Sequence, residues 1–197
     1  MIDNRPVPWR EVFIDEVTHT ITGNVQIYES FPIPQLRTER RIWIYLPRSY
    51  NESNRSFPVY YMQDGQNVFD QATSWGCEWG VDETLEQMAL EDPSLEVIVV
   101  AIDHGGDDRN HEYNFTINAE YNFGGKGAAY ADFLAETLKP YIDSHYRTVL
   151  KRSLRPLLEV RLVLTSRCIR LFAIRISLAV WAGFPLSCGT TVAGSSN

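Results

Sequence analysis

An α/β fold with a mostly parallel sheet and helices on both faces is the class that this sequence predicts. Two apolar runs, Pro58–Met62 and Glu96–Ile102, lack the polar alternation of a half-exposed strand and are typical of buried parallel strands. Loops and helical patterns follow these runs, which is the rhythm of an α/β fold. The chain of 197 residues is long enough for one domain with a sizeable core.

Shorter strand patterns come earlier in the chain. Val25–Tyr28 and Arg41–Leu46 are rich in β-branched and aromatic residues, and Pro47 ends the second of them. Between the two, Pro32 and Pro34 predict an extended or turning connection.

Two helices are expected further along. Asp82 is predicted to begin a helix and to cap its first turn, with Leu85 and Met88 following at helical spacing. Pro93 closes that element. Residues 128–143 form the second, amphipathic helix, whose apolar side chains fall near one face.

Two loops leave the carboxyl ends of the buried strands. They are Gln63–Asp70 and Asp103–Tyr113. Because ligands bind outside the carboxyl ends of the strands in such sheets, both loops are expected on the functional edge.

Charge and composition exclude several kinds of partner. The chain has a net charge of −7, and residues 1–149 are strongly acidic, so a nucleic-acid partner is not expected. Leu171–Leu186 is too short for a membrane span, which takes about 20 residues, and no apolar signal core is visible near Met1, so the cytoplasm is the expected location. The scattered cysteines lack the paired spacing of a zinc site, and no cofactor is expected.

The composition changes near Leu150. Residues 150–197 contain no Asp and no Tyr, although ten tyrosines precede them. The same segment carries 7 Lys+Arg against one Asp+Glu, while residues 1–149 carry 11 against 24. Residues 1–149 and 150–197 are therefore expected to differ in origin.

Several blocks of residues 1–149 resemble one family. They are Arg41–Tyr50, Tyr60–Asp70, Trp79–Glu83, and Gly124–Gly127 with Leu138–Asp143. In this order and spacing they are similar to the esterase group of the α/β-hydrolases, which includes enterochelin-esterase-like and carbohydrate-esterase-like enzymes. The resemblance implies that residues 1–149 are the N-terminal portion of such a domain, with an incomplete sheet.

The resemblance implies acyl transfer. A serine attacks an ester carbonyl, a histidine takes its proton, and an acid orients the histidine. That serine should lie on a G-x-S-x-G elbow after the helix that ends near Asp143. The motif is absent from this sequence, and Gly194–Asn197 does not complete it. No catalytic residue is therefore assigned, and His19 and His145 are interpreted as surface or structural residues.

The genetic code offers an explanation for residues 150–197. When the third base of each codon is joined to the first two of the next, permitted codons for Leu158–Val163 can spell Gly-Ser-Ser-Ala-Gly. Codons for Ala173–Leu186 can spell a second segment that the family is expected to show. We therefore expect a tail that is out of frame, so that the esterase sequence is truncated after about residue 150; a divergent genuine C-terminus is the alternative.

The resemblance also implies an oxyanion hole. Asp64, Gly65 and Gln66 match the loop that supplies one backbone N–H to the developing negative charge, and glycine allows close approach of the backbone. An ordinary turn after a strand is the alternative.

Substrate contacts are expected from residues around this loop. The resemblance implies Trp79 at the pocket edge and Arg109, Glu112 and Tyr113 on a substrate-side loop, where Arg109 would hold a polar acyl or sugar group. The histidines and carboxylates of Asp103–Glu112 also suggest a metal site, but their spacing matches no known ligand pattern, so no metal is expected.

Two functions remain open at this point. The first is a serine esterase whose intact parent cleaves a small-molecule, sugar or siderophore ester, and which is inactive as this chain. The second is a non-catalytic binding module derived from the same fold.

Overall fold

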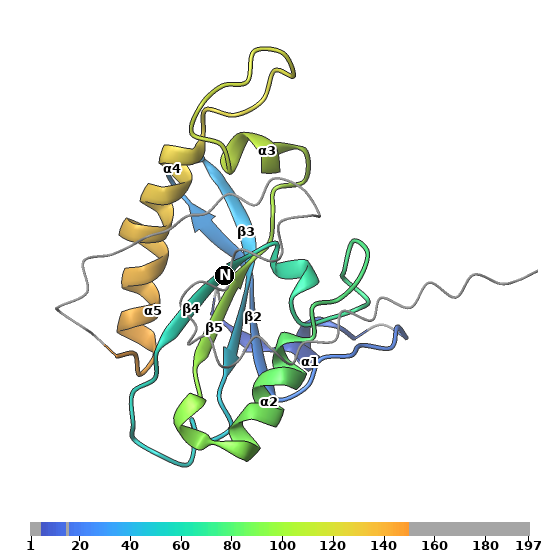
Figure 1. Ribbon diagram of the computed structural model, residues 1–197, viewed down its shortest axis with the longest axis vertical. Helices are drawn as coiled ribbons and strands as arrows, with labels where there is room; N and C mark the ends of the chain where they lie inside the picture. Colours follow the sequence, from blue (N-terminus) through green and yellow to red (C-terminus); the bar gives the residue numbers. More distant parts are fainter. Residues whose placement is uncertain (1–4, 15, 150–197) are drawn as a thin grey trace, which may run out of the picture. The chain divides into compact units, whose positions relative to one another are not determined.

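The computed structural model describes residues 5–14 and 16–149, which form a five-stranded sheet in the order β1-β2-β3-β5-β4 (Figure 1). The strands are β1 (Val7–Pro8), β2 (Asn24–Ile33), β3 (Thr38–Leu46), β4 (Val59–Gln63) and β5 (Ile98–Ile102). The α-helices are α1 (Trp9–Val12), α2 (Val81–Glu91), α3 (Arg109–Glu112), α4 (Gly127–Asp132) and α5 (Lys139–His145). Three 3-10 turns, η1 (Gly65–Asn67), η2 (Pro93–Leu95) and η3 (Gly106–Asp108), and the π-helical segment η4 (Phe133–Leu138) complete the order. The expected α/β class, the four expected strands and both expected helices are confirmed. The expected full burial of both apolar runs holds for β5 but is wrong for β4, which is half-buried at every position because it lies at the edge of the described sheet. The expectations for residues 150–197 lie outside the described residues.

The sheet is mixed, which corrects the expectation of mostly parallel strands. Of its four neighbouring pairs, only β4 with β5 is parallel. The connection between β2 and β3 is the tight turn Pro34–Arg37, where the Leu36 N–H donates to the carbonyl of Ile33. A turn this short can join only antiparallel strands, because parallel strands need a crossover of about a dozen residues or more. That crossover exists between β4 and β5, where α2 intervenes.

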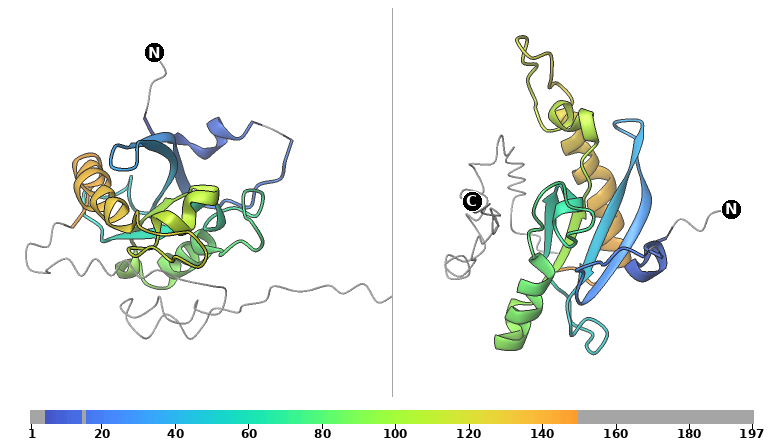
Figure 2. Two further views of the ribbon diagram at one scale, coloured as in Figure 1. Left: turned by 90° about the horizontal axis from the view of Figure 1, so that it is seen from above. Right: turned by 90° about the vertical axis from the view of Figure 1, so that its right-hand side faces the viewer.

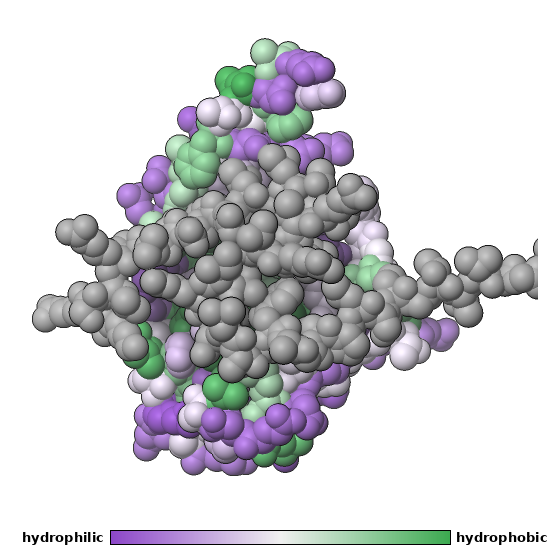
Figure 3. All heavy atoms as spheres, in the orientation of Figure 1, coloured by the Kyte–Doolittle hydropathy of each residue, from purple (hydrophilic) through white to green (hydrophobic). Residues whose placement is uncertain are grey.

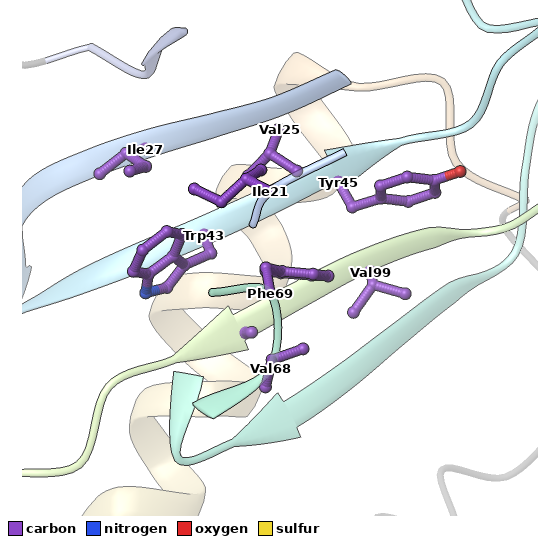
Figure 4. Packing of buried hydrophobic residues seen from close by; sticks show 9 residues of the cluster. Ile21, Val25, Ile27, Trp43, Tyr45, Val68, Phe69 and Val99 are labelled. Atoms are coloured by element: carbon purple, nitrogen blue, oxygen red, sulfur yellow. The ribbon is translucent and has the colours of Figure 1, made fainter. Parts of the chain in front are cut away.

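One face of the sheet packs against α1, η1 and α2. Its core contains Trp43 and Tyr45 from β3 and Val68 and Phe69 from the segment after β4, all at most 1% exposed (Figure 4). Leu85 of α2 and Phe13 after α1 pack against this cluster. Burying such aromatic side chains supplies much of the stability of a small domain.

The opposite face is covered by the continuous helix α4-η4-α5 (Figure 2). Phe31 of β2 contacts Phe133 and Tyr141, with ring centroids 6.2 and 5.0 Å apart. Side chains of β3 alternate between the two faces, so Ile42 and Ile44 are buried on this side. The expectation of helices on both faces is therefore confirmed.

The middle of this long helix is wider than an α-helix. The π-helical segment η4 ends at Leu138, two residues before Pro140, which lies in the first turn of α5. Proline has no N–H to donate to the preceding turn and crowds its carbonyl, so a locally wider turn before Pro140 is the physical consequence. The 3.6-residue periodicity of the sequence predicted the helix but not this widening.

The start of α2 differs from the expectation in its cap. Gly80, with φ of 59°, is the residue before the first turn, and it makes no side-chain cap. Asp82 is fully buried, and its Oδ2 accepts hydrogen bonds from the N–H (2.6 Å) and hydroxyl (3.2 Å) of Thr22. The predicted capping role of Asp82 is therefore wrong: the side chain joins the helix to a segment 60 residues earlier.

After α5 the chain returns to the edge of the sheet. Phe57 and Thr148 form an isolated parallel bridge, with hydrogen bonds from Phe57 N to Arg147 O (2.8 Å) and from Val149 N to Phe57 O (3.0 Å). Phe57 lies just before β4. Residues 147–149 are thus aligned parallel to β4 at the sheet edge.

Candidate functional site

The two loops predicted for the functional edge lie next to each other. Gln63 at the end of β4 pairs with Ile102 at the end of β5, so η1 and the segment from Asp103 to Glu112 begin side by side. Gln66 Oε1 also accepts a hydrogen bond from the N–H of His104 (3.2 Å). The sequence-based placement of both loops at one edge is therefore confirmed.

The turn η1 requires a glycine. A Cβ on Gly65 would lie 2.8 Å from the backbone carbon of Ile102 and 2.9 Å from both the N and the Oδ1 of Asp103. Two of these three contacts involve backbone atoms, so a side-chain rotation cannot relieve them. Asp64 precedes the glycine in the left-handed region, with φ of 57° and ψ of 47°.

The hydrogen bonds that close η1 leave its first amides to other partners. Asn67 N donates to Asp64 O (2.9 Å) and Val68 N donates to Gly65 O (3.1 Å). The first N–H groups of any helical turn have no partner within the turn. Gly65 and Gln66 occupy that position, which is the arrangement an oxyanion donor needs.

Arg109 is held by Asp64. Its Nε and Nη2 each donate to one carboxylate oxygen of Asp64 at 2.7 Å, and its guanidinium lies 5.0 Å from the ring centroid of Tyr113. This hydrogen-bonded pair raises the pKa of Arg109. The structure thus brings Asp64, predicted for the oxyanion hole, into contact with Arg109 and Tyr113, predicted for substrate binding. The guanidinium of Arg109 faces the carboxylate of Asp64.

Glu112 and Tyr113 are buried, at 2% and 3% exposure. Arg40 Nη2 donates to Glu112 Oε1 at 2.6 Å, and burial raises the pKa of the Glu112 carboxyl while Arg40 opposes that change. Tyr113 packs edge-on against Tyr130 of α4, with centroids 5.2 Å apart. In the described structure, Glu112 therefore accepts a hydrogen bond from Arg40, and the ring of Tyr113 packs against the guanidinium of Arg109. Substrate contact by either stays a prediction.

Trp79 is joined to η1 through its backbone. Its N–H donates to the carbonyl of Asn67 (2.8 Å), and the residue is 38% exposed. The indole is thus partly accessible beside the turn, and its expected role at a pocket edge stays a prediction.

A loop with exposed apolar residues projects beyond α3. Phe115, Ile117 and Tyr121 are 51%, 72% and 67% exposed, and apolar and polar residues are mixed over this tip (Figure 3). The loop is fastened at its base, where Gly125 N donates to Asn114 O and Lys126 N donates to His111 O. It connects α3 to the long helix on the other face.

Two part-buried polar contacts were missed from the sequence. Asp103 Oδ1 accepts a hydrogen bond from the indole Nε1 of Trp43 (2.7 Å), and burial raises the pKa of Asp103 to about 6. His19 Nδ1 lies 2.7 Å from Asp70 Oδ2, and its ring stacks on Phe13. Asp103 could have been suspected from its position directly after a buried strand. No local signal joins His19 to Asp70, which is 51 residues later.

The histidines between Asp103 and Glu112 do not lie in a group of metal-ligating side chains in the described structure. His104 Nδ1 accepts from the N–H of Gly106, and His111 Nδ1 lies 3.4 Å from the carbonyl of Gly124. In residues 5–14 and 16–149, three or more metal-ligating side chains come together only at Glu78, Asp82 and Glu83.

A protein-family model described as "Putative esterase" matches residues 33–155, which is more than half of the chain. The chain therefore belongs to this esterase family. The match begins at the end of β2 and covers η1, Trp79 and the segment from Asp103 to Tyr113. A comparison with curated proteins finds no match.

Several solved structures are similar to this chain in fold. The BES protein from Bacillus cereus is 18% identical, with a TM-score of 0.52 over 69% of this chain and 52% of that one. The siderophore hydrolase EstA from Aspergillus nidulans is 17% identical, with a TM-score of 0.50 over 64% of this chain and 44% of that one. An IroE-like serine hydrolase from Shewanella oneidensis is 24% identical, with a TM-score of 0.48 over 63% and 39%. The chain thus spans about half the length of these structures or less.

The helices of residues 5–14 and 16–149 are all too short or too polar to span a membrane.

Proposed function

We propose that residues 1–149 are the N-terminal portion of a serine esterase domain that acts on carboxylic esters. The observation that carries this proposal is η1: Gly65 packs against the backbone at the end of β5, and the first amides of the turn are not used to close it. Fixed backbone donors of this kind stabilise the negative charge of a tetrahedral intermediate. Asp64, Gly65 and Gln66 are the proposed oxyanion side of the site.

The ion pair between Asp64 and Arg109 adds to this proposal. It fastens the residue before Gly65 to α3 through two hydrogen bonds, which fixes the orientation of the turn. Arg109 is proposed to position the turn and, at 30% side-chain exposure, to remain reachable for a polar substrate group. Trp79, Glu112 and Tyr113 complete the proposed substrate side.

The 197-residue chain is proposed to lack serine-dependent turnover, because its sequence contains no G-x-S-x-G motif. The parallel bridge between Phe57 and Thr148 supports a frameshift as the origin of residues 150–197. In the α/β-hydrolase arrangement the nucleophile follows a strand that comes after such a helix. The bridge aligns residues 147–149 with β4 where that strand would begin, about ten residues before the shifted Gly-Ser-Ser-Ala-Gly reading.

The test compares two proteins. The first is the 197-residue chain, and the second is the product of a gene whose reading frame is restored by inserting or deleting one or two bases between the codons of Tyr146 and Leu158. Hydrolysis of a small activated ester, such as p-nitrophenyl acetate, is expected only for the second protein and is expected to disappear when its elbow serine is changed to alanine. Serine-dependent turnover by the 197-residue chain, or an inactive and folded restored protein, would contradict the proposal.

Siderophore or sugar esters are the proposed substrate class of the intact parent. One structure with the same fold is described as a siderophore hydrolase, and Arg109 beside an aromatic ring suits a polar acyl group. No cofactor is required for this chemistry, and the cytoplasm is the proposed location. A panel of siderophore, sugar and simple aryl esters given to the restored protein decides among these classes by kcat/KM.

A binding module without catalysis is the second candidate. The ion pair of Arg40 with the buried Glu112 and the exposed apolar loop with Ile117 and Tyr121 would persist without a nucleophile. Saturable binding of an ester by the 197-residue chain, without hydrolysis, would favour this function.

A further inference from the structure

Three carboxylates meet where α2 begins. Glu78, Asp82 and Glu83 each offer an oxygen, and these oxygens lie within 4.8 Å of one another. Glu78 comes from the loop before the helix, and the other two come from its first turn. The cluster shares no residue with the ion pair of Asp64 and Arg109, and the inference drawn from it does not rest on the proposed esterase function.

Two of these side chains contain buried oxygens that lack a hydrogen-bond donor. Asp82 is fully buried; its Oδ2 is used by Thr22, whereas its Oδ1 has no donor among the described residues. Glu78 Oε2 accepts from the hydroxyl of Thr20 (2.6 Å), and its Oε1 is buried in the same unpartnered state. A buried carboxylate oxygen without a donor is costly, so a cation or a proton is needed to compensate it.

The chemistry and spacing of the three carboxylate oxygens indicate which cation would compensate them. All three ligands are carboxylate oxygens, which hard cations prefer. Oxygens bound to one Ca²⁺ at about 2.3–2.6 Å lie at most about 4.6–5.2 Å apart, whereas the shorter bonds of Mg²⁺ limit the separation to about 4.2 Å. The three oxygens all lie within 4.8 Å of one another, which Ca²⁺ can bridge, and its coordination geometry is more flexible than that of Mg²⁺.

We propose that Glu78, Asp82 and Glu83 form a Ca²⁺ site that joins the start of α2 to the segment containing Thr20 and Thr22. Thr20 and Thr22 are already bonded to Glu78 and Asp82, so the ion would hold both segments through the same carboxylates. Water supplies the remaining ligands of the ion, which takes about 6–8 oxygens in total.

A proton is the other group that can compensate these oxygens, since burial and the neighbouring Glu83 carboxylate raise the pKa of Asp82 above its ordinary range. A proton shared between Asp82 and Glu83 is the competing explanation, and the experiment below separates the two.

The test uses Tb³⁺, which replaces Ca²⁺ and emits when a nearby tryptophan transfers energy to it. Trp79 directly follows Glu78, so excitation of tryptophan in the 197-residue chain is expected to give Tb³⁺ emission at one equivalent of bound metal, and Ca²⁺ is expected to remove it. Asp82→Asn keeps an acceptor for Thr22, and Glu83→Gln changes an exposed residue. Each is expected to weaken metal binding by about tenfold or more, because each removes a charged ligand.

Glu91→Gln is the matched control. It makes the same change of charge on the same helix, at an exposed position outside the cluster, and is expected to bind Tb³⁺ as the parent does. Added Ca²⁺ should also raise the melting temperature of the parent and of Glu91→Gln, because a ligand of the native state stabilises it. The proposal is overturned if Ca²⁺ neither competes with Tb³⁺ nor raises the melting temperature. It is equally overturned if the cluster variants bind the metal as tightly as Glu91→Gln; the carboxylates would then share a proton.

Discussion

Replacing Gly65 by alanine tests whether η1 is built by close approach of two backbones. The added methyl would lie 2.8–2.9 Å from backbone atoms of Ile102 and Asp103. The φ of Gly65 lies outside the left-handed region, so the clash is the main cost of the substitution. Forcing one such group into a packed site costs about 1–3 kcal/mol, and we expect the free energy of unfolding to fall by that amount.

The control is Gly76→Ala, because a Cβ at Gly76 would have nothing within 4 Å. There, alanine is expected to leave the stability unchanged or to raise it by about 0.4–1 kcal/mol through the unfolded state. Urea unfolding followed by tryptophan fluorescence and far-UV circular dichroism gives both values. If the two variants differ by less than about 0.5 kcal/mol, the backbones do not meet as described and the reasoning about η1 fails.

Three further predictions concern charged groups. A double-mutant cycle with Asp64→Ala and Arg109→Ala should give a coupling energy of about 1 kcal/mol in urea unfolding, since the pair is bidentate but partly exposed; additive effects would contradict the pair. Arg40→Met should lower the free energy of unfolding by about 3 kcal/mol at pH 8 and by less at pH 5. The difference arises because the pKa of Glu112 is raised, so its carboxyl takes up a proton at the lower pH once Arg40 is gone. An equal loss at both pH values would refute this. The pKa of Asp82 is raised above its ordinary value of 3.8, so the folded state binds the proton more tightly than the unfolded state does. When a chelator removes free metal, the free energy of unfolding should therefore fall as the pH rises from 3.8 toward the folded-state pKa of Asp82. Asp82→Asn should flatten that fall in pH-dependent unfolding, and an unchanged slope would rule out Asp82 as its source.

The strands and helices were predictable because their signals are local. The apolar run that became β5 is buried at every position, and the helix over residues 128–143 shows a clear apolar face. The direction of the strands was less predictable. A four-residue connection between β2 and β3 permits only an antiparallel pair, whereas the order β3-β5-β4 depends on contacts between segments distant in the sequence.

The candidate site was predictable to the extent that backbone geometry defines it. Gly65 follows an apolar strand, and the need for a glycine there follows from the strand-to-turn geometry. The partners of charged side chains could not be predicted, since Arg109 meets Asp64 across 45 residues and Asp82 meets Thr22 across 60. Periodicity describes neighbours along an element and contains no information about such pairs.

The parallel pairing of β4 with β5 also has a consequence for folding kinetics. β2 and β3 are joined by a four-residue turn, and β-hairpins form in about 1–10 μs. β4 and β5 are separated by η1, α2 and η2, so their pairing must first close a long loop and is expected later. Because η1 rests on this late ladder, changes at Gly65 are expected to speed unfolding far more than they slow folding.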